Sequence, residues 1–130
     1  MSERSLPAPP ITPESAPFFA AAGEGRFVIG HCPGCGKPHW YPRATCPFCA
    51  AAATLRPASG RGVIHSFSVM RRVAPPYAIA YVTLDEGPTM MTNLVDCDFD
   101  ALRIGQRVRL AFRAAEGGTM VPCFRPDDAR

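Results

Sequence analysis

The sequence predicts a mainly β protein that contains a short N-terminal helix, a metal-binding ribbon and a small barrel. Three observations support this fold class. Two Cys-x-x-Cys pairs lie ten residues apart in the first half of the chain, apolar and polar residues alternate with a period of two through the second half, and helix signals occur in one short segment. A chain of 130 residues forms one compact domain or two small ones that support each other, which excludes a large catalytic domain.

The helix is predicted over residues 14–24. Ser15 is a candidate N-cap, the alanines that follow favour helical structure, and Gly23 is placed to end the helix. A helix of about two turns is not stable in isolation, so Phe18 and Phe19 must pack against something. Two partners stay open at this point: the protein's own ribbon, or the surface of another protein.

A rubredoxin-like zinc ribbon is predicted over residues 25–58. Each Cys-x-x-Cys turn directs two thiolates at one point, and together the turns supply a tetrahedral site of four sulfur ligands. A proline after the first cysteine of each pair stiffens the turn, while Gly34 and Gly36 permit positive φ and let backbone N–H groups approach the sulfur atoms. The predicted metal ligands are Cys32, Cys35, Cys46 and Cys49.

Zinc is the expected metal, and iron is a less favoured alternative because similar cysteine pairs build rubredoxin centres. Four protein ligands leave no open coordination position, so the metal is expected to hold the fold together and not to activate water. His31 and His39 flank the site, but the thiolates already fill the coordination shell. Disulfides are disfavoured, because the N-terminus has no apolar stretch that could act as a signal peptide.

The rest of the ribbon is predicted from its apolar residues. Residues 26–30 are expected to form a short strand, and residues 50–58 a connector to the barrel. Trp40 and Tyr41 lie between the two cysteine pairs. We expect these two side chains to shield the metal and to cover a small core that has few aliphatic residues.

A five-stranded OB-fold barrel is predicted over residues 59–126. Period-two alternation marks strands near residues 63–69, 78–84, 89–94, 107–113 and 119–124. Between the third and fourth of these strands, Asp98 can cap a short helical turn that runs through Leu102. Five short strands with a helix after the third match the OB-fold, which is a small Greek-key barrel.

The alternation also predicts which side chains share a face of each strand. The predicted sets are Val63, His65, Phe67 and Val69; Ala78, Ala80, Val82 and Leu84; and Val108, Leu110 and Phe112, which alternate with Arg107, Arg109 and Arg113. The three arginines form either a solvated face or a basic stripe for phosphate or an acidic partner surface.

Composition narrows the classes of function. The chain has 14 basic and 11 acidic residues, and 13 of the basic residues are arginine, so the formal charge is +3. This balance falls short of the dense basic surface of a dedicated nucleic-acid binder. No apolar run approaches the length of a membrane span, so a cytoplasmic protein is expected. Residues 1–13 are expected to form a flexible leader rich in Pro, Ser and Ala, and residues 127–130 a short tail.

The order of these parts resembles the DUF thirty-five family of acyl-CoA-associated proteins, over residues from about 18 to 126. The motifs that carry the resemblance are GRFV (25–28), CPGCG (32–36), YPR (41–43), CPFC (46–49), GRGV (60–63), LDEG (84–87), TNLV (92–95), RIG (103–105) and FRP (124–126). The resemblance implies an accessory subunit that assembles with a thiolase-like enzyme. It also implies that the subunit helps to bind an acyl-CoA and to position its thioester for carbon–carbon bond formation or cleavage.

Four residues are candidate contacts for acyl-CoA. Arg71 and Arg72 end the first barrel strand and enter a loop that many OB-folds use for ligands, where they would meet the phosphates of the CoA head. Tyr77 could stack or line a groove, and Asn93 could orient a ligand through its amide. Each has a structural alternative: solvated arginines at a strand end, a tyrosine over the barrel mouth, and an asparagine bonded to the backbone.

No residue of this chain is predicted to be catalytic. Cys97 lies between two aspartates whose charges disfavour a thiolate, and Cys123 lies in a predicted strand, where buried thiols are common. His65 has no serine or aspartate partner placed by a recognisable motif. Catalysis, if the resemblance holds, is therefore expected to need the partner enzyme.

Single-stranded nucleic-acid binding is the alternative function, because zinc ribbons and OB-folds both serve it in other proteins. That function needs aromatic side chains on the outer barrel face together with a basic groove. Phe67 and Phe112 fall on apolar faces instead, and Tyr81 is the main exception. Nucleic acid is therefore the less favoured partner.

Overall fold

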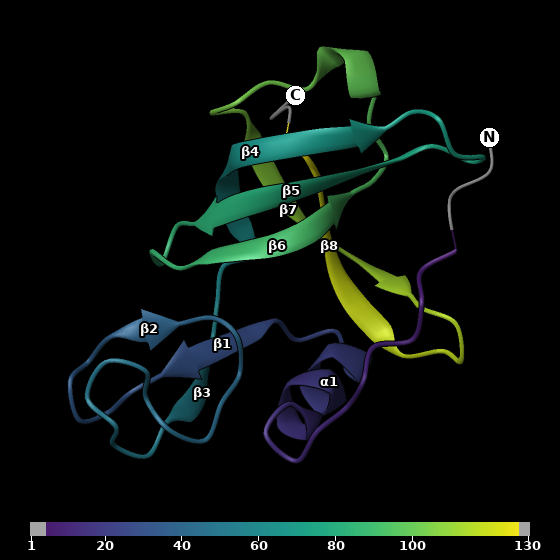
Figure 1. Ribbon diagram of the computed structural model, residues 1–130. Helices are drawn as coiled ribbons and strands as arrows, with labels where there is room; N and C mark the ends of the chain where they lie inside the picture. The colour runs from purple at the N-terminus through teal and green to yellow at the C-terminus, as the bar shows by residue number, and fades with distance from the viewer. Residues whose placement is uncertain (1–4, 128–130) are drawn as a thin grey trace.

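The computed structural model describes residues 5–127 and contains a helix, a small ribbon sheet and a barrel (Figure 1). The elements before the barrel are α1 (Ala16–Gly23), β1 (Val28–His31), β2 (Pro38–His39) and β3 (Thr54–Pro57). The barrel elements are β4 (Arg61–Met70), β5 (Tyr77–Leu84), β6 (Thr89–Leu94), the 3-10 helix η1 (Phe99–Ala101), β7 (Arg107–Ala114) and β8 (Met120–Pro126). The predicted fold class is confirmed. Over the described part of the chain, no helix has the length and apolar character that crossing a bilayer requires.

The five barrel strands close in the order β4-β5-β6-β8-β7. All neighbours are antiparallel except β6 and β8, which are parallel and share one register pair, Leu94 with Phe124. Near this seam, the Thr92 hydroxyl donates to the carbonyl of Pro122 at 3.0 Å. As predicted, the alanine, valine and leucine side chains of β5 face inward and are buried. The predicted turn after β6 is also present, and the Asp98 carboxylate accepts from the backbone N–H of Asp100.

The inward face of β4 changes along the strand, so the single face predicted for its odd-numbered residues is wrong. The register against β5 shifts between Ile64 and Ser66. Ile64 is 1% exposed and faces the core before the shift, whereas Phe67 and Val69 pack against the core after it. A β-bulge inserts one extra residue, which reverses the alternation. His65 is that extra residue, and it is exposed.

The ribbon sheet has the order β2-β1-β3, with β1 antiparallel to both neighbours. The predicted connector over residues 50–58 therefore contains a strand, β3, that pairs with β1 along its whole length. β3 was missed because its sequence, TLRP, is largely exposed and carries no apolar alternation. It is an edge strand that is held by backbone bonds more than by burial.

The start of α1 differs from the prediction, because the Ser15 side chain does not cap the helix. Ser15 has helical backbone angles, with φ −94° and ψ −14°, and is buried. Its hydroxyl instead accepts a hydrogen bond from the backbone N–H of Thr12 at 2.9 Å. An N-cap side chain reaches the helix from an extended backbone, which Ser15 does not have. The backbone N–H groups of Ser15 and Ala16 donate instead to the Thr12 carbonyl, at 3.1 and 2.8 Å.

The helix ends at Gly23, as predicted, but the left-handed residue that terminates it is Gly25. Gly25 has φ +81°, and its backbone N–H donates to the Ala22 carbonyl at 2.9 Å. The N–H of Arg26 donates to the Ala21 carbonyl, also at 2.9 Å. These two bonds form a Schellman motif, in which glycine supplies the left-handed residue.

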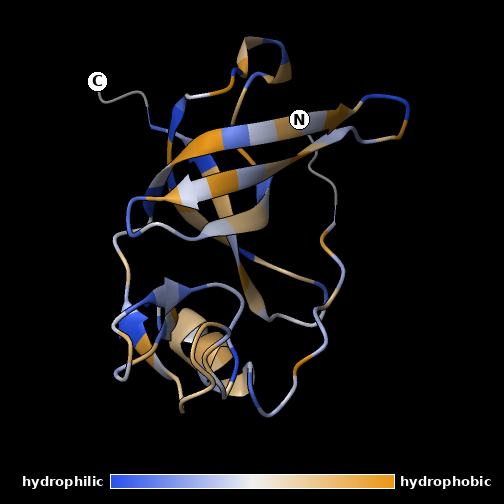
Figure 2. Cartoon of the chain, turned by 60° about the vertical axis from the view of Figure 1, so that its left-hand side comes forward, coloured by the Kyte–Doolittle hydropathy of each residue, from blue (hydrophilic) through white to orange (hydrophobic). Residues whose placement is uncertain are grey.

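An aromatic cluster joins the helix, the ribbon and the barrel into one core. Phe18 is 1% exposed, and its ring lies 5.1 Å from that of Trp40 and 6.3 Å from that of Phe27. Phe27 in turn contacts Phe112 and Phe124 of the barrel, at 6.4 and 6.3 Å. Of the two predicted alternatives for Phe18, docking within the chain is correct. The hydrophobic colour of α1 in Figure 2 belongs to a helix that packs on its own protein.

Part of the N-terminal leader lies against the barrel. The carbonyl of Leu6 accepts from the backbone N–H of Glu116 at 2.9 Å, and the Ser5 hydroxyl donates to the Glu116 carboxylate at 3.0 Å. The expectations of a flexible leader at residues 1–4 and of a short tail at residues 128–130 fall outside the described part of the chain. Asp127, which precedes them, donates its N–H to the Arg107 carbonyl at 2.9 Å.

Candidate metal centre and ligand cavity

The four predicted cysteine ligands meet at one point between the two turns. Their Sγ atoms all lie within 4.8 Å of one another, with Cys32 to Cys49 at 3.4 Å and Cys35 to Cys46 at 3.7 Å. A tetrahedral metal with metal–sulfur bonds of about 2.3 Å separates its ligands by about 3.8 Å. All six cysteines of the chain are free of disulfides. The arrangement therefore fits a single four-coordinate metal ion.

The two cysteine turns repeat the same backbone hydrogen bonds. The bonds are Cys32 N to Lys37 O and Gly36 N to Cys32 O in the first turn, and Cys46 N to Ala51 O and Ala50 N to Cys46 O in the second. The residue after each pair has a left-handed backbone, with φ +77° at Gly36 and φ +67° at Ala50. The prediction of positive φ is thus correct for Gly36, whereas Gly34 is not in that region. Ala50 adopts the same conformation with a side chain.

Backbone N–H groups approach the sulfur atoms, as the turns predict. The N–H of Cys35 points at the Cys32 sulfur at 3.4 Å, and that of Phe48 at the Cys46 sulfur at 3.3 Å. Burial alone would raise the pKa of the Cys46 thiol, but hydrogen bonds from the backbone of Phe48 and Cys49 and from the neighbouring thiols lower this pKa to about 7. The backbone N–H of Ala51 lowers the pKa of the Cys49 thiol, but the neighbouring thiols and burial raise this pKa to about 11. Metals bind thiolates, so Cys46 is the ligand of these two that loses its proton more readily.

The two histidines beside the site belong to no cluster of metal-binding side chains in residues 5–127. The ring of His39 covers Gly30, where an added Cβ would lie 2.1 Å from Nε2. His39 is 3% exposed, and neither ring nitrogen has a hydrogen-bond partner in the described residues. Burial, and then the charges of Arg43 and His31, hold the pKa of His39 below its usual value. His39 is therefore a neutral core residue of the ribbon.

The aromatic residues between the cysteine pairs divide into one packed and one open side chain. Trp40 is partly buried and packs against the core, as predicted. Tyr41 contacts the Trp40 ring at 5.2 Å but remains exposed. The small core of the ribbon is thus covered by Trp40 together with Phe18 of the helix.

A cavity of about 910 Å³ opens at one end of the barrel. Its walls come from the β4–β5 loop (73–77), the end of β6 and the loop after it (93–97), the end of β7 (113–116), Phe99 and the leader. Walls from five separate parts of the chain could not be recognised in the sequence. The leader residues Ser5 and Leu6 in particular carry no signal that places them beside residue 116.

The structure separates the four candidate acyl-CoA contacts into two groups. Tyr77 and Asn93 line the cavity, on neighbouring strands. Arg71 and Arg72 are not part of its lining. Arg71 forms an ion pair with Asp100 at 2.8 Å, in which both side chains are exposed, and Arg72 is exposed. Arg113, which the sequence offered only as part of a solvated face or basic stripe, forms an ion pair with Asp96, and both line the same cavity. Sequence reasoning did not identify Asp96.

The aromatic residues of the barrel behave as their strand faces predict. Phe67 and Phe112 pack against the core. Tyr81 is 49% exposed on the outer face of β5, beside its register partner Met91 on β6, which is 59% exposed. Tyr77, on the same face of β5, lines the cavity, so Tyr81 is the one exposed aromatic side chain of the described barrel strands. Single-stranded nucleic acids use several successive stacking platforms.

Two known domains match consecutive parts of the chain. Residues 19–55 match the rubredoxin-like zinc ribbon domain of ChsH2, and residues 55–113 match its C-terminal OB-fold domain. A DUF35 domain-containing scaffold protein of Methanothermobacter thermautotrophicus is 37% identical over 90 residues, which cover 63% of this chain and 68% of that protein. A probable enoyl-CoA hydratase alpha subunit of Thermomonospora curvata is 34% identical over 127 residues. The match covers 92% of this chain but 40% of that relative.

Two solved structures share the fold. A structure described as an Ltp2-ChsH2(DUF35) aldolase superposes with a TM-score of 0.81 and 33% identity, and the match covers 92% of this chain and 98% of that chain. A DUF35 protein of unknown function from Sulfolobus solfataricus superposes with a TM-score of 0.65 and 13% identity, over 88% and 86% of the two chains. The second similarity supports the fold alone.

Proposed function

Because this chain belongs to the DUF35 family, we propose that it is an accessory subunit that assembles with a thiolase-like enzyme and helps to position an acyl-CoA thioester for carbon–carbon bond formation or cleavage. The observation that carries the proposal is the similarity to the chain described as an Ltp2-ChsH2(DUF35) aldolase, of which 98% is covered. The partner enzyme supplies the catalytic groups in this proposal.

The cavity beside Tyr77 and Asn93 supports an acyl-CoA ligand. Its volume of about 910 Å³ lies at the upper end of the range of small-molecule pockets, about 300–1,000 Å³. Its walls combine apolar residues such as Val73 and Leu94 with the hydroxyl and amide of the two candidate residues. Such walls suit the nearly neutral pantetheine and acyl parts of the ligand. Arg71 and Arg72, outside the lining, would contact the phosphates of a CoA head that extends into solvent.

The four-cysteine centre supports a structural zinc ion. When bound, zinc would be held by Cys32, Cys35, Cys46 and Cys49 and would supply folding energy to the ribbon. Because the coordination shell is full, these residues keep the ribbon ordered beside the barrel and take no part in chemistry on the thioester. Reduced thiols of this kind are maintained in the cytoplasm, where we place the protein. Elemental analysis of the purified protein distinguishes zinc from iron.

The test is reconstitution with the thiolase-like subunit encoded in the same genome. We expect a stable complex on gel filtration, and calorimetric binding of acetyl-CoA that Tyr77→Ala and Asn93→Ala each weaken about tenfold. Tyr81→Ala is the matched control, because Tyr81 is exposed on the outer face of β5, away from the cavity lining. Failure of the complex to form would reject the accessory role. Unchanged acetyl-CoA affinity in both cavity variants would reject the ligand site.

A further inference from the structure

The outer surface of the barrel divides into an uncharged side and a charged side. The strands β5 and β6, from Tyr77 to Leu84 and from Thr89 to Leu94, contain no Asp, Glu, Lys or Arg. The arginines of the barrel strands lie on β7, on β8 and at the start of β4. The fold therefore collects its positive charge on one side of the barrel.

Cross-strand register places three of these arginines in one row. Arg61 on β4 is the register partner of Arg109 on β7, and Arg109 is in turn the register partner of Arg125 on β8. Directly opposed residues point to the same face of a sheet, about 5 Å apart. Their neighbours Val108 and Phe124 are fully buried, so the three arginines point outward. We call Arg61, Arg109 and Arg125 the arginine row.

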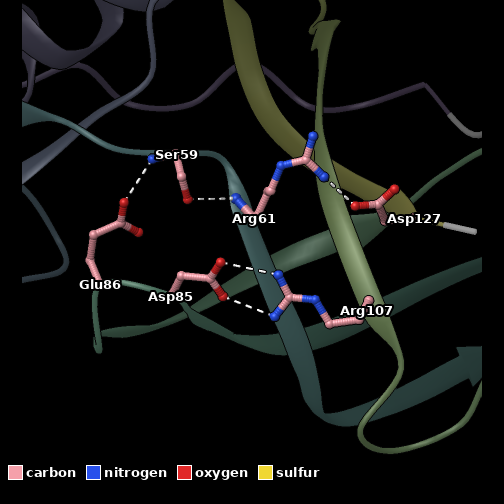
Figure 3. A network of polar contacts seen from close by, with 6 residues as sticks. All are labelled: Ser59, Arg61, Asp85, Glu86, Arg107 and Asp127. Carbon is pink, nitrogen blue, oxygen red and sulfur yellow. Dashed lines mark hydrogen bonds and ion pairs between the residues drawn. The ribbon is translucent and has the colours of Figure 1, made fainter. Parts of the chain in front are cut away.

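Aspartates lie beside the two ends of the arginine row but not beside its middle residue, Arg109. Arg61 pairs with Asp127, and the neighbouring Arg107 holds both carboxylate oxygens of Asp85, at 2.9 and 3.1 Å (Figure 3). At the other end, Asp96 pairs with Arg113 and lies 3.9 Å from Arg125. Four of the five arginines on this side of the barrel thus share three aspartates, and Arg109 is the fifth.

Arg109, in the middle of the row, makes no ion pair with any residue in the range 5–127, and it is exposed. In addition, the Nε of Arg125 is buried and has no hydrogen-bond partner among those residues. Like charges directly opposite each other on a sheet are destabilising. Arg109 therefore lies between two other guanidinium groups without a carboxylate of its own, and a bound anion would offset the repulsion at this position.

We propose that the arginine row docks an acidic, carboxylate-bearing surface of the partner enzyme. Guanidinium groups bind carboxylates through paired N–H donors, and a row of three matches an extended acidic surface. The identity of the partner rests on the proposed function. The chemistry of the docking surface rests on the register of β4, β7 and β8 alone.

Two other anions fit this surface less well. Small phosphate ligands bind in concave sites, and none of the three row residues lines either of the described cavities. Single-stranded nucleic acids need aromatic side chains beside the basic groups. The large exposed hydrophobic residues of the barrel strands are Tyr81 and Met91, on β5 and β6, and none lies on β7 or β8. A protein surface rich in carboxylates remains the best match.

The first experiment measures association with the thiolase-like subunit at low and high ionic strength. We expect Arg109→Gln to slow association about fivefold at low ionic strength and to reduce its salt dependence. Arg56→Gln, which removes the same charge from an exposed position in β3, should associate like the wild type. Wild-type kinetics for Arg109→Gln would overturn the proposal. If the wild-type chain does not bind the subunit at all, the proposed function fails, and the second experiment decides the docking surface independently.

The second experiment uses a fluorescent glutamate-rich peptide and the full chain, followed by anisotropy. Binding that Arg109→Gln weakens about threefold, and that Arg56→Gln leaves unchanged, would support the arginine row as a carboxylate surface. Equal affinity of all three proteins would overturn it. Tighter binding of a labelled oligodeoxythymidylate of equal charge, or displacement of the peptide by lower concentrations of inorganic pyrophosphate, would also overturn it, in favour of a phosphate-containing ligand.

Discussion

The ribbon and the barrel reach stability by different physical means. The barrel strands are 6 to 10 residues long, and each of the five carries buried side chains that point into one closed core. The ribbon strands have four, two and four residues, and only β1 contributes buried aliphatic side chains, Val28 and Ile29. A sheet this small cannot exclude enough water to fold alone. The four cysteine sulfur atoms of the ribbon indicate that a bound metal ion supplies the stability that a larger hydrophobic core would otherwise give.

The two regions nevertheless share one hydrophobic cluster. Phe27 of the ribbon contacts Phe18 of the helix on one side and Phe124 of the barrel on the other. Figure 1 shows α1 and the ribbon strands below the barrel, with α1 beside the lower end of β8. We therefore expect the ribbon to need a metal for folding and the barrel to fold without one. A few aromatic contacts couple the two.

Metal removal should have the largest effect and should act on the ribbon. Structural zinc sites contribute about 10–16 kcal/mol of binding energy to folding, so chelation or Cys35→Ser should unfold the ribbon while the barrel stays ordered. Backbone amide NMR spectra would show collapse of the signals of residues 28–57 only. Cys97→Ser, in the loop after β6, is the matched control and should keep all signals. Loss of the barrel signals on chelation would show that the two units are not separable.

Phe27→Ala should test the coupling between the two units. Removal of a buried phenylalanine costs about 3–5 kcal/mol, and here it also breaks the contact from the ribbon to Phe112 and Phe124. We expect the single denaturant transition of the metal-bound protein to split into two. Phe48→Ala is the control, because Phe48 is 58% exposed and its loss should change stability by less than about 0.5 kcal/mol. One unsplit transition in Phe27→Ala would contradict the coupling.

The buried His39 should make the ribbon, and not the barrel, sensitive to mild acid. Its pKa in the folded protein lies below its usual value, so the unfolded chain binds the proton more readily. Stability is therefore complete above the unfolded pKa of about 6.5 and falls as the pH drops below it, by about 1.4 kcal/mol for each unit of pKa difference.

Unfolding measured between neutral and mildly acidic pH checks this dependence. His39→Gln should flatten the pH profile relative to the wild type. His65→Gln should leave it unchanged, since His65 is the exposed residue of the β4 bulge. Identical profiles for His39→Gln and the wild type would contradict a buried neutral histidine.

The smallest expected effects on stability come from the left-handed residue that follows each cysteine pair. Ala50 has φ +67°, a conformation that costs a residue with a side chain about 1–2 kcal/mol. Ala50→Gly should therefore stabilise the metal-bound protein by about 1 kcal/mol, and Gly36→Ala, at the equivalent position with φ +77°, should destabilise it by a similar amount. No atom lies within 4 Å of a Cβ added at Gly36, so the backbone conformation alone determines the stability change of Gly36→Ala. Thermal unfolding measures both effects. Destabilisation by Ala50→Gly, or stabilisation by Gly36→Ala, would refute the equivalence of the turns.

Local patterns were predicted well from the sequence. The cysteine ligands follow from spacing within two tight turns, and the inward face of β5 follows from regular alternation. The helical turn after β6 follows from one capping aspartate. In each case the residues that decide the structure are close together in the chain.

Features that depend on pairing between distant segments were missed. β3 forms because β1 offers its edge, and the bulge at His65 appears only against the register of β5. The cavity needs the leader beside Glu116, and the arginine row needs three strands aligned. Arg71 and Arg72 were predicted beside a ligand loop, but only the structure shows that Tyr77 and Asn93 line the cavity without them.

The sequence by itself therefore determined the parts: a four-cysteine centre, a short aromatic helix and a five-stranded barrel. These rest on short-range spacing, which fixes local geometry directly. The tertiary structure alone decided how the parts meet: Phe18 and Phe27 at their junction, the cavity at one end of the barrel, and the charge on one of its sides. The physical reason is that strand register and side-chain packing join residues that are far apart in the chain. A local sequence pattern does not specify which distant residues will meet.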